Sequence, residues 1–312
     1  MAAPQLIRLA AGSLRVELAP AIGGSISRFE GGWREDERQG RVDWLRPASP
    51  AALSENNPLG MSSFPLLPFC NRIRNGRASF EGREIRFPPN HPAERSPHPL
   101  HGIGWQRPWA VQESDATHAV LTLDVPASTA WPWRFCASQH FELDDEMLRV
   151  TMALTNLDRA GMPAGIGHHP YFPHTRGTRL TSSAAAMWET DAEVMPTTLA
   201  VTDTVEKLRA GVVVSELALD NNFVGWEHSA LVQWPADRTG PARSLLMEAA
   251  TPLDYFVLYS PRGFDHFCAE PVSQCTDCLN LLAQCGPGAV GGARVPPGQS
   301  LRASFTLTPH WS

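Results

Sequence analysis

The sequence predicts an all-β protein built as a large antiparallel sandwich or barrel. The 312 residues include 28 prolines and 24 glycines, which favour short strands and turns over long helices. Apolar residues recur at every second position in several segments, as in strands with one buried face. No apolar stripe with helical spacing exceeds about two turns. Because no repeat or linker divides the chain, we expect residues 1–312 to form a single domain.

Segments with this alternation occur along the whole chain. They predict strands at residues 14–18, 78–80, 85–87, 119–125, 135–143, 148–154 and 301–307. Glu81-Gly82-Arg83 lies between the second and third of these segments and predicts a hairpin. The turn Asp144-Asp145-Glu146 connects the long segments at residues 135–143 and 148–154. The best candidate for a short helix is residues 205–209.

The composition excludes several classes of partner. The net charge is −6 and no basic run is present, so we expect no nucleic acid partner. No apolar stretch approaches the roughly 18 residues that a membrane span needs, and we expect no membrane partner. The N-terminal segment carries charge within its apolar stretch and does not have the layout of a signal peptide. We therefore expect a cytoplasmic protein whose six cysteines are thiols.

Four of the cysteines cluster near the C-terminus as C-x6-C-x2-C-x6-C, at Cys268, Cys275, Cys278 and Cys285. A structural zinc site usually offers two close pairs, and this spacing offers one, so we expect no metal there. Cys-Ala-Glu followed by Cys-x-x-Cys is also similar to zinc deaminases. In those enzymes a strand and turn precede the second motif, whereas here only four residues separate Glu270 from Cys275.

Polar residues stand in four places that could carry chemistry. Arg72 precedes the predicted hairpin, and His101 directly precedes a glycine that lets the backbone approach a ligand. His168 and His169 are adjacent, so in a strand only one of them can face a given cavity. Asp220 and Glu270 complete the set. Each also has a plainer interpretation, as a surface arginine, a solvated loop histidine or an exposed carboxylate.

Glu270 is the least easily explained as a surface charge. It follows Phe267, Cys268 and Ala269 and precedes Pro271. Such apolar surroundings raise the pKa of a carboxyl group towards that of a working base. A positioned histidine and such a carboxylate would form a complementary pair for proton transfer near neutral pH.

Taken in order, these motifs resemble the aldose 1-epimerase (galactose mutarotase) family. The resemblance covers most of the chain, and it is the order and spacing of the motifs that carry it. The matching stretches are Asn71-Arg72-Ile73 with Gly76, Phe80-x-Gly82, Asn90, Leu100-His101-Gly102, His169-Pro170-Tyr171-Phe172, Leu219-Asp220-x-x-Phe223 and Glu270-Pro271.

The resemblance implies a fold and a set of roles. The fold is a large antiparallel β-sandwich, the supersandwich, with the sugar bound in an open cleft. Glu270 matches the general base that takes the proton of the C1 hydroxyl, and His169 matches the general acid that protonates the ring oxygen. Arg72, His101 and Asp220 match residues that hold sugar hydroxyls, and His101 can also help to polarise the ring oxygen. The resemblance implies no metal and no cofactor.

Two other functions stay open on the same fold. Some branches of the family act on hexose 6-phosphates, and Arg74, Arg95 and Arg107 could hold a phosphate or could simply be surface charges. A carbohydrate-binding protein without catalysis is the other alternative, although a lectin needs no acid–base pair. The chain departs from the family pattern at Pro173, where asparagine is common, and at Cys275 and Cys278. The identity of the aldose, the oligomeric state and the role of the cysteine cluster are left open.

Overall fold

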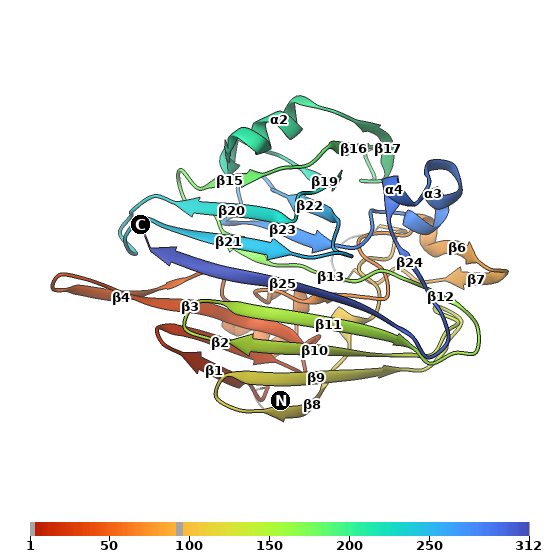
Figure 1. Ribbon diagram of the computed structural model, residues 1–312, viewed down its shortest axis with the longest axis horizontal. Coiled ribbons are helices and arrows are strands. Elements are labelled where there is room, and N and C mark those ends of the chain that lie inside the picture. Colours follow the sequence, from red (N-terminus) through yellow and green to blue (C-terminus); the bar gives the residue numbers. More distant parts are fainter. Residues whose placement is uncertain (1–3, 92–95, 312) are drawn as a thin grey trace.

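The computed structural model describes residues 4–91 and 96–311, and strands dominate this part of the chain (Figure 1). They form three main sheets in which neighbouring strands pair in antiparallel fashion. The all-β fold class predicted from the alternating pattern is therefore confirmed.

The largest sheet has nine strands and forms one layer of the molecule. The four strands predicted after residue 100 are neighbours in this sheet. Each buries most of one face and leaves the other towards solvent. In spatial order the strands are β18 (Val212–Val213), β15 (Arg179–Ser182), β20 (Ser229–Trp234), β21 (Arg243–Ala249), β25 (Ser300–Trp311), β11 (Leu148–Asn156), β10 (Phe135–Leu143), β9 (His118–Val125) and β8 (Ala110–Ser114).

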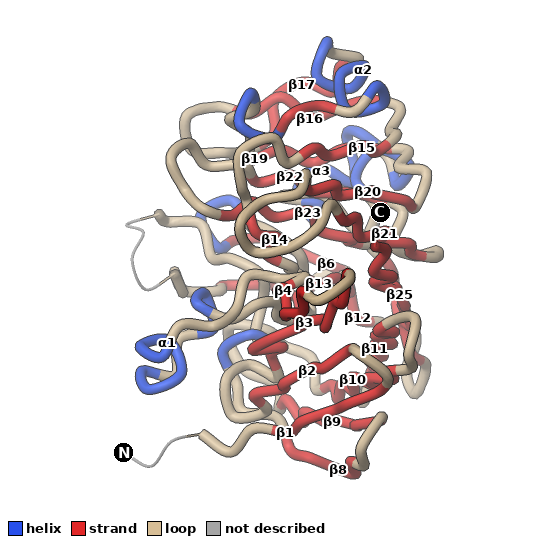
Figure 2. The backbone as a smooth tube through the Cα atoms, turned by 90° about the vertical axis from the view of Figure 1, so that its left-hand side faces the viewer, coloured by secondary structure: helices blue, strands red, loops and turns tan. Residues whose placement is uncertain are grey.

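Two further sheets form the second layer (Figure 2). One has eight strands: β17 (Pro196–Ala200), β16 (Ala186–Thr190), β19 (Asp220–Val224), β22 (Tyr255–Tyr259), β23 (His266–Val272), β13 (Gly167–His168) and β5 (Pro65–Leu66), with β14 (Tyr171–Pro173) also paired to β23. The other contains β1 (Ile7–Ala11), β2 (Leu14–Ala19), β3 (Ser25–Glu35) and β4 (Arg38–Asp43). A long sheet covered by two shorter ones is the large antiparallel sandwich that the sequence predicts.

One continuous apolar core fills the space between the layers. Its buried members come from all three sheets and include Leu9, Leu121, Phe141, Leu245 and Phe256. Burying a leucine or phenylalanine side chain contributes about 1.5–3 kcal/mol, so this layer contact is the main source of stability.

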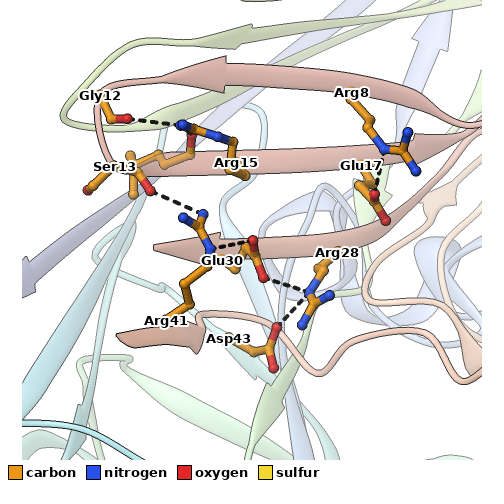
Figure 3. Close-up of polar contacts among 10 residues, drawn as sticks. Arg8, Gly12, Ser13, Arg15, Glu17, Arg28, Glu30, Arg41 and Asp43 are labelled. Carbon is orange, nitrogen blue, oxygen red and sulfur yellow. Dashed lines mark hydrogen bonds and ion pairs between the residues drawn. The ribbon is translucent and has the colours of Figure 1, made fainter. Parts of the chain in front are cut away.

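Charged side chains cover the outer face of the four-stranded sheet (Figure 3). Arg28 lies 2.9 Å from Glu30 and 3.0 Å from Asp43, and Arg41 lies 2.5 Å from Glu30. Exposed pairs of this kind contribute about 0–1 kcal/mol each. The sheet is therefore held by its apolar inner face, and these pairs keep its outer face soluble.

The predicted hairpin consists of β6 (Arg77–Phe80) and β7 (Arg83–Arg86). Its turn has only two residues, Glu81 and Gly82, with φ of 46° and 79°. Positive φ at both positions is typical of a tight two-residue hairpin. Arg83 therefore belongs to the strand and not, as expected, to the turn.

Helices are short. The predicted helix at residues 205–209 lies within α2, which buries Val205 and Leu208. The sequence did not predict α3, because a helix of eight residues is too short to show a long apolar stripe. Among the described residues no helix is long and apolar enough to cross a membrane. The bounds are α1 (Pro50–Glu55), α2 (Asp203–Ala210), α3 (Cys278–Cys285) and α4 (Pro287–Val290), with 3₁₀ turns η1 (Pro58–Gly60), η2 (Arg74–Gly76), η3 (Gly104–Gln106) and η4 (Val214–Glu216). A small sheet joins β12 (Met162–Ala164) to β24 (Ala293–Val295).

His168 links the two layers through polar contacts inside the core. Its Nε2 lies 3.2 Å from Oε1 of Gln139 in β10, and its Nδ1 contacts the hydroxyl of Ser63. Because the amide nitrogen of Gln139 donates to Gly24 O, Oε1 acts as the acceptor for His168. Burial lowers the pKa of His168 to about 3, so the ring is neutral at physiological pH.

Replacing His168 with glutamine should make the fold less sensitive to acid. The folded-state pKa of about 3 lies below the unfolded value of about 6.5, so the unfolded chain takes up the proton first. The stability that this histidine contributes is present above pH 6.5 and is lost as the pH falls towards 3, by about 2 kcal/mol at pH 5. Between pH 7 and pH 5, urea unfolding should show a loss of stability about 2 kcal/mol smaller in His168→Gln than in the wild type, because the other buried histidines still contribute to both.

His310→Gln, at an exposed position of β25, controls for the removal of any histidine. If the wild type and His168→Gln lost equal stability between pH 7 and pH 5, the loss could not be assigned to the buried His168 ring.

Candidate functional site

A pocket lies beside β23 and gathers side chains from segments far apart in the sequence. Its volume is about 300 Å³, at the small end of sites that hold small molecules. The five residues selected from the sequence, Arg72, His101, His169, Asp220 and Glu270, all line it. The other lining residues are Arg46, Leu59, Asn71, His91, Leu100, Tyr171, Tyr259, Phe264 and His266.

The two adjacent histidines face opposite sides of the backbone, as period-two geometry requires. His168 points between the sheets, and His169 points into the pocket. The backbone N–H of His169 donates to Phe64 O at 3.0 Å. Its ring lies 4.7 Å from the ring centroids of both Phe64 and Tyr171. Backbone and aromatic contacts together fix the orientation of this imidazole.

His169 meets Glu270 in direct contact. Nε2 of the histidine lies 3.2 Å from Oε1 of the glutamate, and the two side chains are 8% and 2% exposed. The remaining polar atoms, His169 Nδ1 and Glu270 Oε2, are buried and have no hydrogen-bond partner among the described residues. Buried polar atoms are nearly always satisfied in native proteins, so these two atoms point to a ligand that completes the site.

The surroundings disfavour charge on both members of this pair. Burial raises the pKa of Glu270 well above its usual range; the negative charge of Asp220 raises it further, and Arg72 opposes the shift. Burial also lowers the pKa of His169 to about 3. Both directions favour a carboxyl group beside a neutral imidazole, with one proton able to move along the 3.2 Å contact.

Arg72 and Asp220 form an ion pair at the edge of the pocket. Nη1 of Arg72 lies 3.3 Å from Oδ2 of Asp220 and donates to Oδ1 of Asn71 at 3.1 Å. Asp220 begins β19, which pairs with β22, the neighbour of β23. Asp220 thus lies on the same sheet as Glu270, and with Arg72 it offers charged donors and acceptors suitable for holding hydroxyl groups.

His101 lies in a loop with an unusual backbone conformation. Its φ is +59° and that of Asn71 is +55°, a region that residues other than glycine seldom adopt. The N–H of Asn71 donates to His101 Nδ1 at 3.2 Å, so the proton of the neutral ring resides on Nε2. Burial, with a smaller effect of His169, lowers the pKa of His101 well below its usual value. His101 is therefore a neutral hydrogen-bond donor near pH 7.

Asn90 and Gly102 hold this loop in place. The Asn90 amide accepts from Leu100 N at 2.6 Å and donates to the carbonyl oxygens of Leu100 and Gly102 at 2.8 and 3.2 Å. Gly102 has φ of +72°, and a Cβ there would lie 2.2 Å from Leu67 O. Only glycine lets the two backbone segments approach this closely.

Sequence reasoning missed Arg46 and His266. His266 could have been found, since it precedes Glu270 by four residues on β23 and therefore shares its face. Arg46 lies in a stretch without a motif. Its backbone N–H donates to Tyr171 O at 2.8 Å, a contact that only the fold creates.

Two of the three arginines considered for phosphate binding, Arg74 and Arg107, do not line this pocket. Arg74 forms ion pairs with Asp191 at 3.9 Å and Asp277 at 3.5 Å. Arg107 is exposed after η3, and Arg95 lies outside the described residues. The alternative in which Arg74 and Arg107 hold a phosphate in this pocket is therefore wrong, because neither side chain lines it.

His169, Cys268 and Glu270 place one potential metal ligand each within 4.8 Å of one another. A metal would require the thiolate, whereas burial raises the pKa of Cys268 well above its usual value. Cys278 and Cys285 begin and end α3, about 10 Å apart along its axis. The cysteine cluster in the sequence therefore does not form one ligand cluster in space.

The sequence matches the family model described as aldose 1-epimerase over residues 7–308. It is 29% identical to the uncharacterized Escherichia coli K12 protein YphB, over 97% of this chain and 98% of that protein. It is 26% identical to E. coli YihR, over 70% and 72% of the two chains.

Solved structures share the fold. A candidate aldose 1-epimerase from E. coli K12 superimposes with a TM-score of 0.83 at 26% identity, covering 99% of both chains. A galactose mutarotase-like protein from Clostridium acetobutylicum gives 0.81 at 20% identity, covering 98% of this chain and 95% of that one. A GalM/aldose epimerase homologue from Caenorhabditis elegans gives 0.77 at 18% identity and covers 99% of both.

Gly102→Ala should destabilise the protein more than Gly82→Ala. Both glycines have positive φ, of 72° and 79°, so both substitutions cost about 1–2 kcal/mol in backbone conformation. At Gly102 the new methyl group also meets Leu67 O at 2.2 Å, whereas nothing lies within 4 Å at Gly82. We expect urea unfolding to show a further loss of about 1–3 kcal/mol for Gly102→Ala. Equal losses at the two sites would mean that the His101 loop adapts freely.

Proposed function

Since this chain belongs to the aldose 1-epimerase family, we propose that it interconverts the α and β anomers of an aldose by opening and reclosing the sugar ring. The observation that carries the proposal is the buried contact of 3.2 Å between His169 and Glu270. It brings a proton donor and a proton acceptor together in a pocket of about 300 Å³. A protein that only binds sugar has no need of such a pair.

Ring opening requires two proton transfers on one small ring. Glu270 takes the proton of the C1 hydroxyl, and the electrons of that O–H bond form the C1 carbonyl. The C1–O5 bond breaks, its electrons pass to O5, and His169 donates a proton there. Rotation about C1–C2 turns the other face of the aldehyde towards O5. The reverse transfers then close the ring as the other anomer.

The protonation states of the pair suit this cycle. The proton of the Glu270 carboxyl group first passes to His169 along their 3.2 Å contact, which gives a carboxylate and an imidazolium. Opening then converts these back into a carboxyl group and a neutral imidazole, without change in the total number of protons. Burial favours the uncharged pair, as shown by the raised pKa of Glu270 and the lowered pKa of His169. The pocket therefore favours both transfers during opening, while the sugar oxygens supply partners for the unsatisfied buried atoms of the pair.

Three further residues would hold the sugar during bond rotation. The Arg72–Asp220 pair offers a donor and an acceptor for ring hydroxyls. His101, with its proton on Nε2, would donate to a hydroxyl or to the ring oxygen. Positioning of this kind lets two weak acid–base groups act on one molecule without a metal or cofactor.

Glu270→Gln should reduce the rate of anomer exchange by about 10²–10⁴-fold, because glutamine keeps the shape but cannot take the proton. His169→Gln should cause a loss of similar size. Polarimetry and NMR exchange on α-glucose, α-galactose and charged aldoses measure these rates. Glu248→Gln, an exposed position of β21 in the opposite layer, is the matched control and should keep the wild-type rate.

Failure of the wild type to accelerate exchange of any aldose would contradict the proposed activity and favour a binding protein on the same fold. A full rate in Glu270→Gln would instead remove only the assignment of the base. Stoichiometric zinc in the purified protein, lost on replacing Cys268, would contradict a metal-free reaction.

A further inference from the structure

Arg46 is held rigidly at one end of the pocket. Its Nη2 donates to the carbonyl oxygens of Leu59 at 3.0 Å and Met61 at 2.8 Å. Its guanidinium carbon lies 4.0 Å from the centroid of the Tyr171 ring. Its Nη1 lies 3.4 Å from Nδ1 of His266, which lines the same end. The guanidinium is thus fixed in orientation before any ligand arrives.

The positive charge of Arg46 is not neutralised by these contacts. All of its anchors are carbonyl dipoles or aromatic rings, and among the described residues no carboxylate lies within ion-pair distance of it. The other arginine of the pocket, Arg72, is paired with Asp220. Asp265, the acid beside His266, contacts that ring at 3.0 Å but is 87% exposed and therefore strongly screened.

The position of this charge relative to the acid–base pair is set by β23. Glu270 and His266 are four residues apart on the same face of the strand, about 13 Å between Cα atoms. Tyr171 contacts both the His169 ring and Arg46, so one aromatic ring separates the guanidinium from the imidazole that would protonate O5. In a pyranose, the terminal carbon is attached to C5, on the side of the ring oxygen away from C1. With His169 at O5, as in the proposed reaction, a substituent there would extend past His169 towards Arg46.

We propose that Arg46 and His266 form an anion subsite, and that the substrate is an aldose whose terminal carbon carries a carboxylate or phosphate group. The inference rests on the proposed epimerase function and specifies its substrate class. Nη2 of Arg46 already donates to Leu59 and Met61, so the Nε–H and Nη1–H groups and the positive charge remain for an oxyanion, with the His266 ring beside them. A neutral hexose would leave this charge without a counterion inside the pocket.

The test compares charged and neutral aldoses in anomer exchange. The wild type should show a higher kcat/KM for galacturonate or glucose 6-phosphate than for galactose and glucose, and the two charged sugars separate a carboxylate from a phosphate site. Arg46→Gln should lower the charged-to-neutral ratio of kcat/KM by at least about 10-fold. Arg46→Lys should retain part of the preference, and Arg107→Gln, which removes an exposed arginine outside the pocket, should leave the ratio unchanged.

Binding of non-epimerisable ligands separates this inference from the proposed function. The methyl glycosides of galacturonate and glucose 6-phosphate have no free C1 hydroxyl, and calorimetry measures their affinity directly. If no aldose is turned over but these ligands bind in an Arg46-dependent manner, the anion subsite stands and the epimerase proposal falls. An unchanged ratio in Arg46→Gln, a wild-type preference for neutral hexoses, or binding that does not depend on Arg46 would overturn the subsite. If Arg46→Gln does not fold, His266→Gln tests the same end of the pocket.

Discussion

The contact between His169 and Glu270 can exist only where the backbone holds both side chains without help from solvent. β23 lies inside the eight-stranded sheet, paired with β22 on one side and with β13 and β14 on the other. Its backbone groups are therefore satisfied, and its apolar neighbours keep water from the carboxyl group. The exclusion of water raises the pKa of Glu270 and lowers that of His169, because burying an uncharged carboxyl–imidazole pair costs less free energy than burying its ionised form.

Because water is excluded around Glu270, the other charged side chains near it need partners. Asp220 would repel a carboxylate on Glu270, and Arg72 offsets that repulsion by pairing with Asp220. This leaves Arg46 as the charge without an acidic partner among the described lining residues. The proposed anion subsite fits this arrangement, since a substrate with a negative charge would complete the one charge that the reacting end does not neutralise.

The sequence could predict features that depend on local periodicity or on motifs. Alternation located the long strands, and the parity of neighbouring residues meant that His168 and His169 face opposite sides. The family resemblance selected five residues that the fold places around one pocket. Arg46 could not be found in this way, because its position depends on a contact with Tyr171 between segments far apart in the chain. The two-residue turn at Glu81 and α3 depended similarly on backbone geometry that composition does not specify.

The site divides into a rigid part and a more adjustable part. Glu270 and Tyr171 belong to paired strands and His169 directly follows one, whereas His101 depends on a loop braced by Asn90 and the close approach of Gly102. Backbone strain at His101 persists only because these contacts over-determine it. If the proposed function holds, changes in the loops would therefore alter which hydroxyls are held without moving the His169–Glu270 pair. Under the two proposals, this separation would let one sandwich keep a single proton-transfer chemistry while loop residues such as Arg46 set the sugar that it accepts.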